Sequence, residues 1–530
     1  MILAMYDVSG IQEYIFQSSR MKENVGASRI VGDVLKVHLR DVLMRQYADD
    51  AGERVVCEWS LQNEFSILTN SAVMIEVVYI GGGNALIAFR SIDDYNEVNE
   101  KLAKRLLEVS HTLYLAVAAI ESDAGSFIAD KSRLEERMAA VKAQMLRPKP
   151  PGAFPVSEQE AQSGLPITDY SHVVKSNVSR LQRLKQEAIP KEDKQEPIKF
   201  PDNQFGFQTW AFQMDDLIRE RDKDSFVAII HIDGNGMGKQ LREKQRELKM
   251  PAYSDEVQKI RQWSRQISSG YSDVFAETIV SLLEAQPTDC WNRPAPQLPI
   301  RPLIMDGDDL TIVCLGAWGV PLAARLLENL EKASCNKKAD DLSLSACAGV
   351  VLVHSHFPFH LGYAAAEECC KRAKKQRIAE GGDGAYVGFE IVRGSNPKQS
   401  NLEHLQERPY RISDSKHSTS DHSSSSRQAQ PDDFSTLAAC IAKIADSDWP
   451  NSRLERLHAA LLGDSEQRRL YLQECKSRGY TLEQLLLKVT NGCLEADDIS
   501  NAGRRLLLDA LDLYRMFDRK VWTWGKEEMG

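Results

Sequence analysis

The stretch RPLIMDGDDLTIV, residues 301–313, decides how this chain folds. Two apolar runs flank a short bend with one glycine and three aspartates, which is typical of a β-hairpin with an acidic turn. The bend consists of Asp306, Gly307, Asp308 and Asp309. Like charges at a hairpin tip repel one another unless a cation neutralises them. The stretch therefore predicts either an ordinary Asp-Gly turn or a metal site, and the rest of the chain favours the metal site.

Another carboxylate lies at the end of a second predicted strand. Residues 226–231 are apolar and lead to Asp233. If this strand lies beside the hairpin in one sheet, Asp233 converges with Asp308 and Asp309. Carboxylate oxygens are the ligands that Mg²⁺ and Mn²⁺ prefer, and phosphoryl transfer requires such cations. We therefore predict that these three aspartates are catalytic metal ligands.

The residues after Asp233 suit a phosphate group. Glycines let backbone N–H groups approach phosphate oxygens, and the helix that follows presents its positive N-terminus to the same anion. The predicted phosphate-contacting residues are Gly234, Asn235, Gly236 and Gly238. Lys374, in a predicted helix over 361–375, or Lys239 would neutralise phosphate charge. The alternatives are an ordinary turn for the glycines and a solvated helix end for the lysines.

The same order of elements is predicted twice. Each half contains a strand, helices, a hairpin, a helix and a strand, which is the order of a ferredoxin-like palm domain. In the first half, strands are predicted at 1–7, 72–80, 85–89 and 113–120, with helices within 25–43 and 93–109. In the second half, helices are predicted at 239–248, 255–283, 321–333 and 361–375, with strands at 226–231, 342–353 and 385–392 beside the hairpin. The predicted fold class is α+β with two palms.

The first hairpin lacks the carboxylates of the second. Its turn reads Gly81-Gly82-Gly83-Asn84, and Asp7 stands alone at the end of the first strand. One carboxylate cannot hold two metal ions, so we predict a catalytically silent palm. Its Ser9, Gly82 and Gly83 would bind a nucleotide; the alternative is a scaffold that supports the active palm.

Five segments follow from these patterns. Residues 1–121 form the first palm, 122–224 a mostly helical connector with a helix at 173–187, and 225–395 the second palm. Residues 396–432 are polar and predicted to be a disordered linker, and 433–530 form a C-terminal helical bundle.

The composition is that of an ordinary globular protein. The chain has 530 residues, 42% of them hydrophobic, and a net charge of −10, which argues against global attraction to nucleic acid. It contains no apolar run of membrane-spanning length and no signal peptide, so no membrane association is expected. Its ten cysteines form neither a disulfide pattern nor a zinc motif. A cytoplasmic location is expected.

At these motifs the chain resembles the palm-containing polymerase/cyclase subunit of type III CRISPR effectors, which is distantly similar to GGDEF nucleotide cyclases. The resemblance is carried by residues 7–16, 27–29 and 81–84 in the first half and by 233–238, 307–309 and 354–375 in the second. It implies two palms packed together, which bind ATP and join it into linear or cyclic oligoadenylates. It also implies Asp233, Asp308 and Asp309 as metal ligands and Lys374 as a phosphate contact.

The resemblance also implies partners and shows departures. Other subunits of a crRNA-guided effector, target RNA, and a downstream effector that responds to a soluble nucleotide are implied as partners. The family's hairpin is usually Gly-Gly-Asp-Asp, but Asp306 stands at its first position. A third carboxylate there either tunes metal binding or points away. No HD nuclease segment precedes the first palm, so DNA cleavage is not expected.

Two alternative functions stay open, and so does the role of His231. The chain could be a non-catalytic scaffold or RNA-binding subunit of the effector, or a GGDEF-like dinucleotide cyclase. His231 lies two residues before Asp233, on the same face of the strand, and is either a packed histidine or a partner of the site. His354 and His356 are assigned to a loop.

Overall fold

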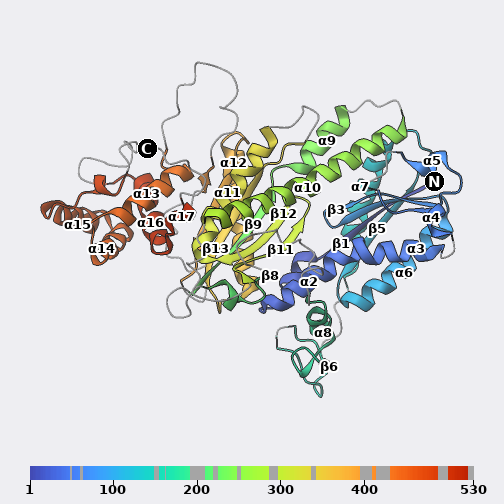
Figure 1. Ribbon diagram of the computed structural model, residues 1–530, viewed down its shortest axis with the longest axis horizontal. Helices are drawn as coiled ribbons and strands as arrows, with labels where there is room; N and C mark the ends of the chain where they lie inside the picture. The colour runs from blue at the N-terminus through green and yellow to red at the C-terminus, as the bar shows by residue number, and fades with distance from the viewer. Residues whose placement is uncertain are drawn as a thin grey trace.

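In the computed structural model the chain forms two large β-sheets with surrounding helices, two small two-stranded sheets, and a group of C-terminal helices (Figure 1). This mixed α/β architecture agrees with the predicted class. None of the described helices combines the length and the apolarity that a membrane span needs. The structure describes residues 1–47, 50–59, 64–147, 154–161, 163–190, 209–218, 225–247, 252–285, 297–335, 342–393, 409–412, 430–486 and 499–522.

The first sheet has the strand order β2-β3-β4-β1-β5. β1 lies between β4 and β5 and is antiparallel to both. Alternate residues of β1 face opposite layers: Ile2, Ala4 and Tyr6 pack on one side, and Leu3 and Met5 on the other. The strands are β1 (Ile2–Ser9), β2 (Val55–Val56), β3 (Ile75–Gly81), β4 (Asn84–Phe89) and β5 (Tyr114–Glu121).

The second sheet has the order β11-β12-β9-β13-β14-β15. Its first four strands repeat the arrangement β3-β4-β1-β5 of the first sheet, with β9 in the place of β1. β9 is buried along almost its whole length because the sheet is covered on both faces. The strands are β9 (Phe226–Gly234), β11 (Ile300–Asp306), β12 (Asp309–Leu315), β13 (Ala346–His354), β14 (Tyr386–Ile391) and β15 (Tyr410–Arg411).

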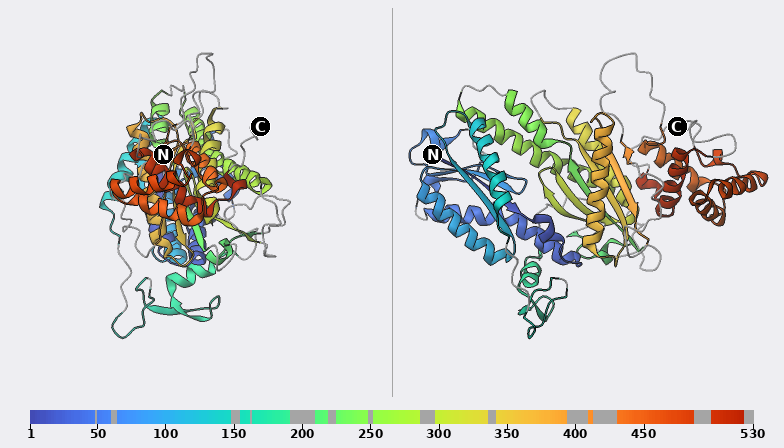
Figure 2. Two further views of the ribbon diagram at one scale, coloured as in Figure 1. Left: turned by 90° about the vertical axis from the view of Figure 1, so that its left-hand side faces the viewer. Right: turned by 180° about the vertical axis from the view of Figure 1, so that it is seen from behind.

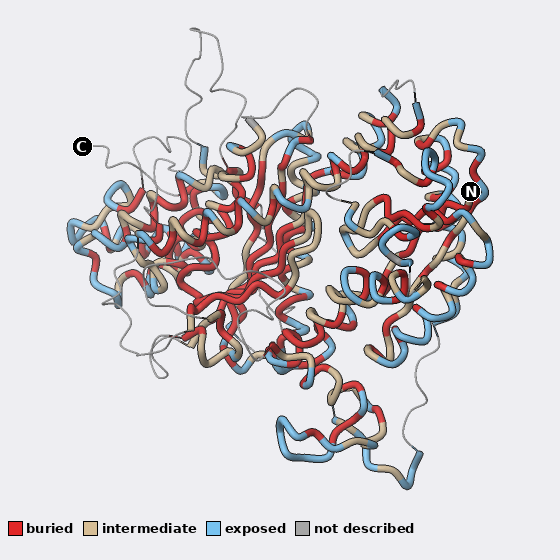
Figure 3. Tube along the Cα trace, turned by 45° about the vertical axis from the view of Figure 1, so that its right-hand side comes forward, coloured by how far each residue is buried: buried red, intermediate tan, exposed pale blue. Residues whose placement is uncertain are grey.

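Helices cover both sheets, and Figure 3 shows the buried strands as red tubes between them. Around the first sheet they are α1 (Ile11–Phe16), α2 (Met21–Asp33), η1 (Val34–Leu39), α3 (Arg40–Gln46), α4 (Ala51–Arg54), α5 (Ser66–Thr69), α6 (Ile92–Ser110) and α7 (Phe127–Gln144). Around the second they are α9 (Met237–Glu247), α10 (Tyr253–Ala285), α11 (Gly316–Cys335) and α12 (Phe359–Ala379). The predicted helix at 25–43 is thus divided, because η1 is a π-helix between α2 and α3.

Two predictions for the connecting segments were wrong. The helix predicted at 173–187 begins only at Arg180, because the preceding residues form a hairpin of β6 (Ile167–Ser171) and β7 (Ser176–Ser179). This hairpin and α8 (Arg180–Glu187) form a small lobe below the first sheet in Figure 1. The predicted linker 396–432 contains β15, which pairs with β14. Most of that linker, including its serine run, lies outside the described residues.

The remaining elements include the C-terminal helices, which lie beyond the second sheet, at the end of the molecule opposite the first sheet (Figure 2). They are α13 (Phe434–Asp446), α14 (Asn451–Leu462), α15 (Ser465–Ser477), η7 (Leu482–Gln484), α16 (Asn501–Leu513), η8 (Tyr514–Met516) and α17 (Arg519–Trp522). Tyr410 of β15 donates a hydrogen bond to Asp509 of α16 at 2.5 Å, so β15 connects the sheet to these helices. Before β9 lie β8 (Thr209–Trp210), which pairs with β10 (Gln297–Leu298), and η3 (Met214–Leu217).

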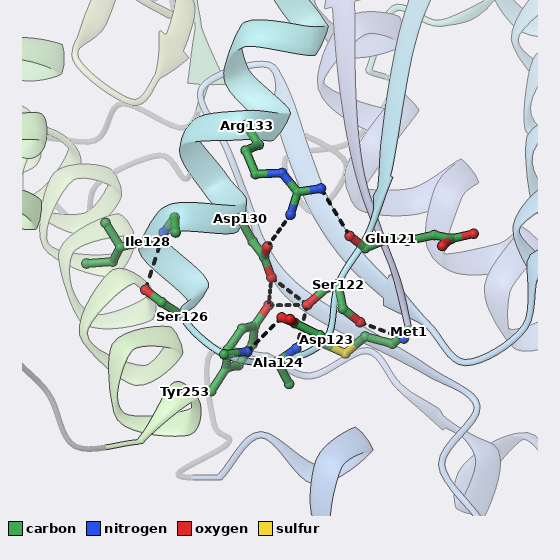
Figure 4. A network of polar contacts seen from close by, with 12 residues as sticks. Met1, Glu121, Ser122, Asp123, Ala124, Ser126, Ile128, Asp130, Arg133 and Tyr253 are labelled. Carbon is green, nitrogen blue, oxygen red and sulfur yellow. Dashed lines mark hydrogen bonds and ion pairs between the residues drawn. The ribbon is translucent and has the colours of Figure 1, made fainter.

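A buried polar network joins the two halves where α7 meets the start of α10 (Figure 4). Asp130 of α7 accepts hydrogen bonds from Ser122 at 2.5 Å and from the hydroxyl of Tyr253, the first residue of α10, at 3.2 Å. The backbone N–H of Ile128 donates to Glu256 of α10 at 3.1 Å. Because each acceptor here is a carboxylate, these hydrogen bonds are of the stronger class and fix α10 against the first sheet.

Candidate functional site

The end of β9 brings together two of the predicted carboxylates. Asp233 is opposite Asp309 of β12 on one side and opposite Cys347 of β13 on the other. Directly opposite residues of an antiparallel pair project from the same face of the sheet. This register confirms that the strand ending at Asp233 lies beside the acidic hairpin.

Asp308 lies in the turn and packs against the last residue of β9. A Cβ atom on Gly234 would be 2.5 Å from Asp308 Oδ2 and 2.9 Å from the Tyr271 hydroxyl. Glycine at 234 therefore leaves the space that the Asp308 carboxylate occupies. Gly307 has a φ of +66°, which allows the tight turn that carries Asp308.

The pKa values of Asp308 and Asp309 are raised at this site. Burial and then the charges of Asp233 and Asp308 raise the pKa of Asp309 to about 7. Burial is also the main reason that the pKa of Asp308 is raised, with Asp233 adding to it. The pKa of Tyr271, on α10, is raised by burial and by these same aspartates, so its hydroxyl stays protonated and donates to the Ser345 carbonyl at 3.2 Å. The site concentrates negative charge that a cation would stabilise.

Lys374 supplies the one positive charge that directly contacts Asp233 among the described residues. Its ammonium group forms an ion pair with the Asp233 carboxylate and donates a hydrogen bond to the Gly234 carbonyl at 2.8 Å. The lysine comes from α12, which packs across β13 and β9. It is therefore held at the site and is not a solvated helix end, which was the alternative. Lys239, by contrast, is exposed and lies 3.8 Å from Glu243.

His231 belongs to the same group of side chains. Its ligand atom and those of Asp233 and Asp309 all lie within 4.8 Å of one another, a grouping that could hold a metal ion. His231 Nδ1 lies 3.4 Å from the Thr311 hydroxyl, and burial lowers the pKa of its imidazole, so the neutral form that binds metals is favoured. The buried hydroxyl of Tyr363 has no hydrogen-bond partner among the described residues, and its ring centroid lies 5.6 Å from that of His231.

These donors fit a divalent cation of the predicted kind. Carboxylate oxygens suit Mg²⁺ and Mn²⁺, and the carboxylates Asp233, Asp308 and Asp309 dominate the set. Burial, and after it the neighbouring carboxylates, raises the pKa of Asp308 and of Asp309, and a bound cation would stabilise their charged forms. An added imidazole favours Mn²⁺ over Mg²⁺, since nitrogen ligands suit the transition metals better.

The segment after Asp233 is partly fixed to β13. The backbone N–H of Asn235 donates to the Ser345 carbonyl at 2.7 Å, and its side-chain amide donates to the Ser345 hydroxyl at 2.8 Å. Asn235 is 4% exposed, which limits what it can offer to a phosphate. Gly236 has a φ of +64° and directs the chain into α9, whose second residue is Gly238. Phosphate binding by these residues remains a prediction.

The first sheet contains the same framework without the carboxylates. Asp7 of β1 is opposite Asn84 where Asp233 is opposite Asp309. It forms an ion pair of 2.8 Å with Lys142 of α7, the helix that follows β5 as α12 follows β13. Lys142 and Lys374 stand at the same position counted from the first residues of their helices. The Ser9 hydroxyl lies 3.3 Å from Asp7, so it is committed to this small polar group.

The two hairpin turns contact each other. The backbone N–H of Gly82 donates to Asp306 Oδ1 at 3.2 Å, and a Cβ on Gly83 would be 3.7 Å from Asp306 Oδ2. Beside this contact lies a cleft lined mainly by apolar side chains of α1, α2 and β11 and by Ser28, Lys36 and Asp306. Gly83 lines the cleft, but Ser9 does not.

Sequence reasoning did not find Tyr271, Lys142 and Tyr363. No local motif marks these two tyrosines: Tyr271 comes from the middle of α10, and Tyr363 lies near the start of α12. Lys142 carried a signal, because it has the same place in its half as Lys374, but it was assigned to a connector outside the first palm.

Comparisons with known proteins were made for the sequence and for the fold. Residues 226–380 match the family model described as Cas10/Cmr2, second palm domain. No curated protein was found to match the sequence.

Solved structures resemble most of the chain. A Csm1–Csm4 cassette in complex with AMPPNP matches with 15% identity and a TM-score of 0.52, covering 96% of this chain and 69% of the solved one. The cassette in complex with cA3 matches with 16% identity and a TM-score of 0.51, covering 98% and 70%. The complex with pppApA gives 14% identity, a TM-score of 0.51 and coverage of 98% and 69%. At this identity the likeness concerns the fold. The segment that matches the Cas10/Cmr2 second palm domain, residues 226–380, contains the strand end, the acidic hairpin and Lys374.

Proposed function

We propose that this chain is a metal-dependent nucleotidyltransferase that converts ATP into linear or cyclic oligoadenylates. The observation that carries the proposal is the register of the second sheet. It sets Asp233 opposite Asp309 and beside Asp308, within the segment that matches the second palm family. The likeness in fold to cassettes crystallised with AMPPNP, pppApA and cA3 supports ATP as substrate and oligoadenylates as products.

In this proposal Asp233, Asp308 and Asp309 hold Mg²⁺ or Mn²⁺, and His231 stands as a further donor. Bound there, the cation would neutralise phosphate charge and lower the pKa of a coordinated hydroxyl. Lys374 would turn from the Asp233 carboxylate to a phosphate oxygen. Tyr271, held protonated, would keep the carboxylate group in place. The main contributions of the chain are the positioning of the reactants and the stabilisation of charge.

The reaction would join two nucleotides. The 3′-hydroxyl of one ATP attacks the α-phosphorus of the next, a new O3′–P bond forms, and the bond to the β-phosphate oxygen breaks to release pyrophosphate. The hydroxyl proton leaves to solvent, because no side chain stands out as a general base. Repetition lengthens the chain. Attack by the terminal 3′-hydroxyl on the α-phosphorus of the first nucleotide closes a ring, as the bond to the β-phosphate oxygen of that nucleotide breaks and its pyrophosphate leaves.

We further propose that the first sheet is a second, silent palm of ferredoxin-like order. Its strand arrangement repeats that of the second sheet, while Lys142 neutralises Asp7, the carboxylate that corresponds in position to Asp233. A nucleotide bound there would meet the turn at Gly82 and Gly83 and the adjoining cleft. The nucleotide that supplies the attacking 3′-hydroxyl would then be bound by the first half. The contact between the two hairpin turns would separate it from the acidic site.

The proposal also covers the partners. The solved relatives are cassettes of Csm1 with Csm4, which supports a partner subunit of that kind for this chain. On the same grounds we propose that the chain belongs to a crRNA-guided complex that senses target RNA. A downstream effector would respond to the soluble product.

The test is product formation. The purified chain is incubated with each NTP and Mg²⁺ or Mn²⁺, with and without RNA and a Csm4-type partner, and products are identified by mass spectrometry. ATP with Mn²⁺ should give oligoadenylates, and Asp308→Asn with Asp309→Asn should abolish them. Asp273→Asn, at an exposed position of α10 in the same half, is the matched control and should leave the yield unchanged. Product that persists in the double variant would refute the site, and no product under any condition would favour the scaffold alternative.

A further inference from the structure

The two hairpins hold each other through reciprocal contacts. Both contain a bulge shortly before the turn, between Val77 and Tyr79 in one and between Pro302 and Ile304 in the other. The carbonyl that each bulge frees is the acceptor for a helix of the opposite half. Ser28 of α2 donates to the Leu303 carbonyl, and Arg261 of α10 donates to the Val78 carbonyl at 2.9 Å.

This arrangement is nearly symmetric up to the turns, where one residue breaks it. Asp306 pairs with Asp309 across its hairpin, and the equivalent residue of the first hairpin is Gly81, which pairs with Asn84. Asp306 thus adds a carboxylate on one side of the contact only. Gly307 packs on the other turn, and a Cβ there would be 3.5 Å from the Gly82 Cα.

The Asp306 carboxylate is directed to the first hairpin. Its Oδ1 accepts the Gly82 N–H at 3.2 Å. Burial raises the pKa of Asp306, and the charge of Lys36 and the amides of Gly82 and Gly83 act in the opposite direction. Of the two expectations for Asp306, these contacts favour the one in which its carboxylate points away from the acidic site.

From this geometry we propose that Asp306 is a positioning residue, which holds the acidic turn against the silent half and thereby orients Asp308 and Asp309. The inference rests on the proposed function for its catalytic consequence. Asp308 and Asp309 follow Asp306 within one tight turn, so a rotation of this turn displaces both carboxylates together. A displacement of about 1 Å at a reacting centre costs about 100-fold in rate. The silent palm then contributes a hydrogen-bond donor that sets the geometry of the active one.

The test combines three measurements on the full chain with Asp306→Ala and Asp306→Asn. Loss of the acceptor in Asp306→Ala should make the Gly82 amide exchange with deuterium about tenfold faster, the factor that one net hydrogen bond is worth. The same variant should lower kcat at least about tenfold, keep the KM for ATP within about twofold, and weaken Mn²⁺ binding less than Asp309→Asn does, because both ligand carboxylates are retained. Asp306→Asn retains a carbonyl acceptor, so exchange and kcat should stay within about threefold of the unmodified chain.

Asp309→Asn is the matched control, since it removes a neighbouring carboxylate that belongs to the metal group. It should weaken Mn²⁺ binding while leaving Gly82 exchange slow. An Asp306→Ala variant that loses Mn²⁺ affinity as Asp309→Asn does, or one whose Gly82 amide exchanges at the original rate, would overturn the inference. Exchange and Mn²⁺ binding do not need turnover, so an inactive chain would refute the proposed function and still leave these two measurements to decide on Asp306.

Discussion

Replacing Arg261 should weaken the contact between the two halves more than any surface change. Arg261 and Glu76 are both fully buried, and their side chains form an ion pair of 2.9 Å. The guanidinium also donates to the carbonyls of Val78 and Val77 at 2.9 Å and of Glu64 at 3.0 Å. All four acceptors lie in the first half, whereas Arg261 comes from α10 of the second.

The magnitude follows from what the substitution Arg261→Met leaves behind. Glu76 still accepts a hydrogen bond of 2.7 Å from the Ile67 N–H, but it loses its only ion-pair partner among the described residues. Removing one partner of a buried pair costs about 3–5 kcal/mol, because the other charge stays buried without compensation. The unsatisfied carbonyls add to the cost but not independently. We expect a loss of about 4 kcal/mol in the free energy of opening of β3.

The assay is native-state hydrogen exchange of β3 amides in increasing urea, with fluorescence of the nearby buried Trp263 as a second probe. Arg40→Met is the matched control, because Arg40 and Glu58 form an exposed pair, with side chains 54% and 53% exposed, worth less than about 1 kcal/mol. Arg261→Met combined with Glu76→Leu should recover part of the loss. An effect of Arg261→Met no larger than that of Arg40→Met would refute the reasoning.

Three further predictions concern the site. The pKa of Asp309 is raised to about 7 from 3.8, so the folded chain binds more protons than the unfolded chain between these values, and stability falls as pH rises through that range. Asp309→Asn should therefore raise the melting temperature relative to the unmodified chain more at pH 7.5 than at pH 5. Lys374→Met removes the cation that pairs with Asp233, so Mn²⁺ should bind about tenfold tighter in calorimetry while product formation falls. Gly234→Ala places a methyl group 2.6 Å from Asp308 Cβ, and should weaken Mn²⁺ binding at least about tenfold.

Each of these has a distinct control. For the pH series it is Asp273→Asn, whose melting temperature should follow the unmodified chain at both pH values. For Lys374→Met it is Lys371→Met, since Lys371 is 61% exposed and pairs with Glu367 and not with the site. For Gly234→Ala it is Gly52→Ala, where an added Cβ meets nothing within 4 Å. A control that behaves as its partner does would contradict the corresponding prediction.

The hairpin and its strand neighbour were predictable because both depend on local pattern and on the strand order of one sheet. Apolar runs around Gly307 predict the turn, and the βαββαβ order then sets Asp233 beside it. The polar helix predicted at 173–187 was wrong over its first part, because β6 and β7 form a hairpin there whose tip leaves Val173 and Val174 exposed.

The contacts across the two halves could not be predicted, because they join residues far apart in the chain. Asp306 and Gly82 are separated by 224 positions, and nothing near either residue indicates the other. Tertiary packing determines such pairs, and hydrophobic periodicity is not sensitive to it.

The near symmetry of the two turns has a consequence for stoichiometry. In a dimer of identical chains, a substitution at the axis enters both copies and the interface must accommodate two facing carboxylates. Within one polypeptide the two sides can differ, so an acceptor at Asp306 can meet an N–H at Gly82 without a like charge opposite it. Covalent linkage of the halves thus permits one acidic centre per molecule and an interface that no homodimer of either half could form.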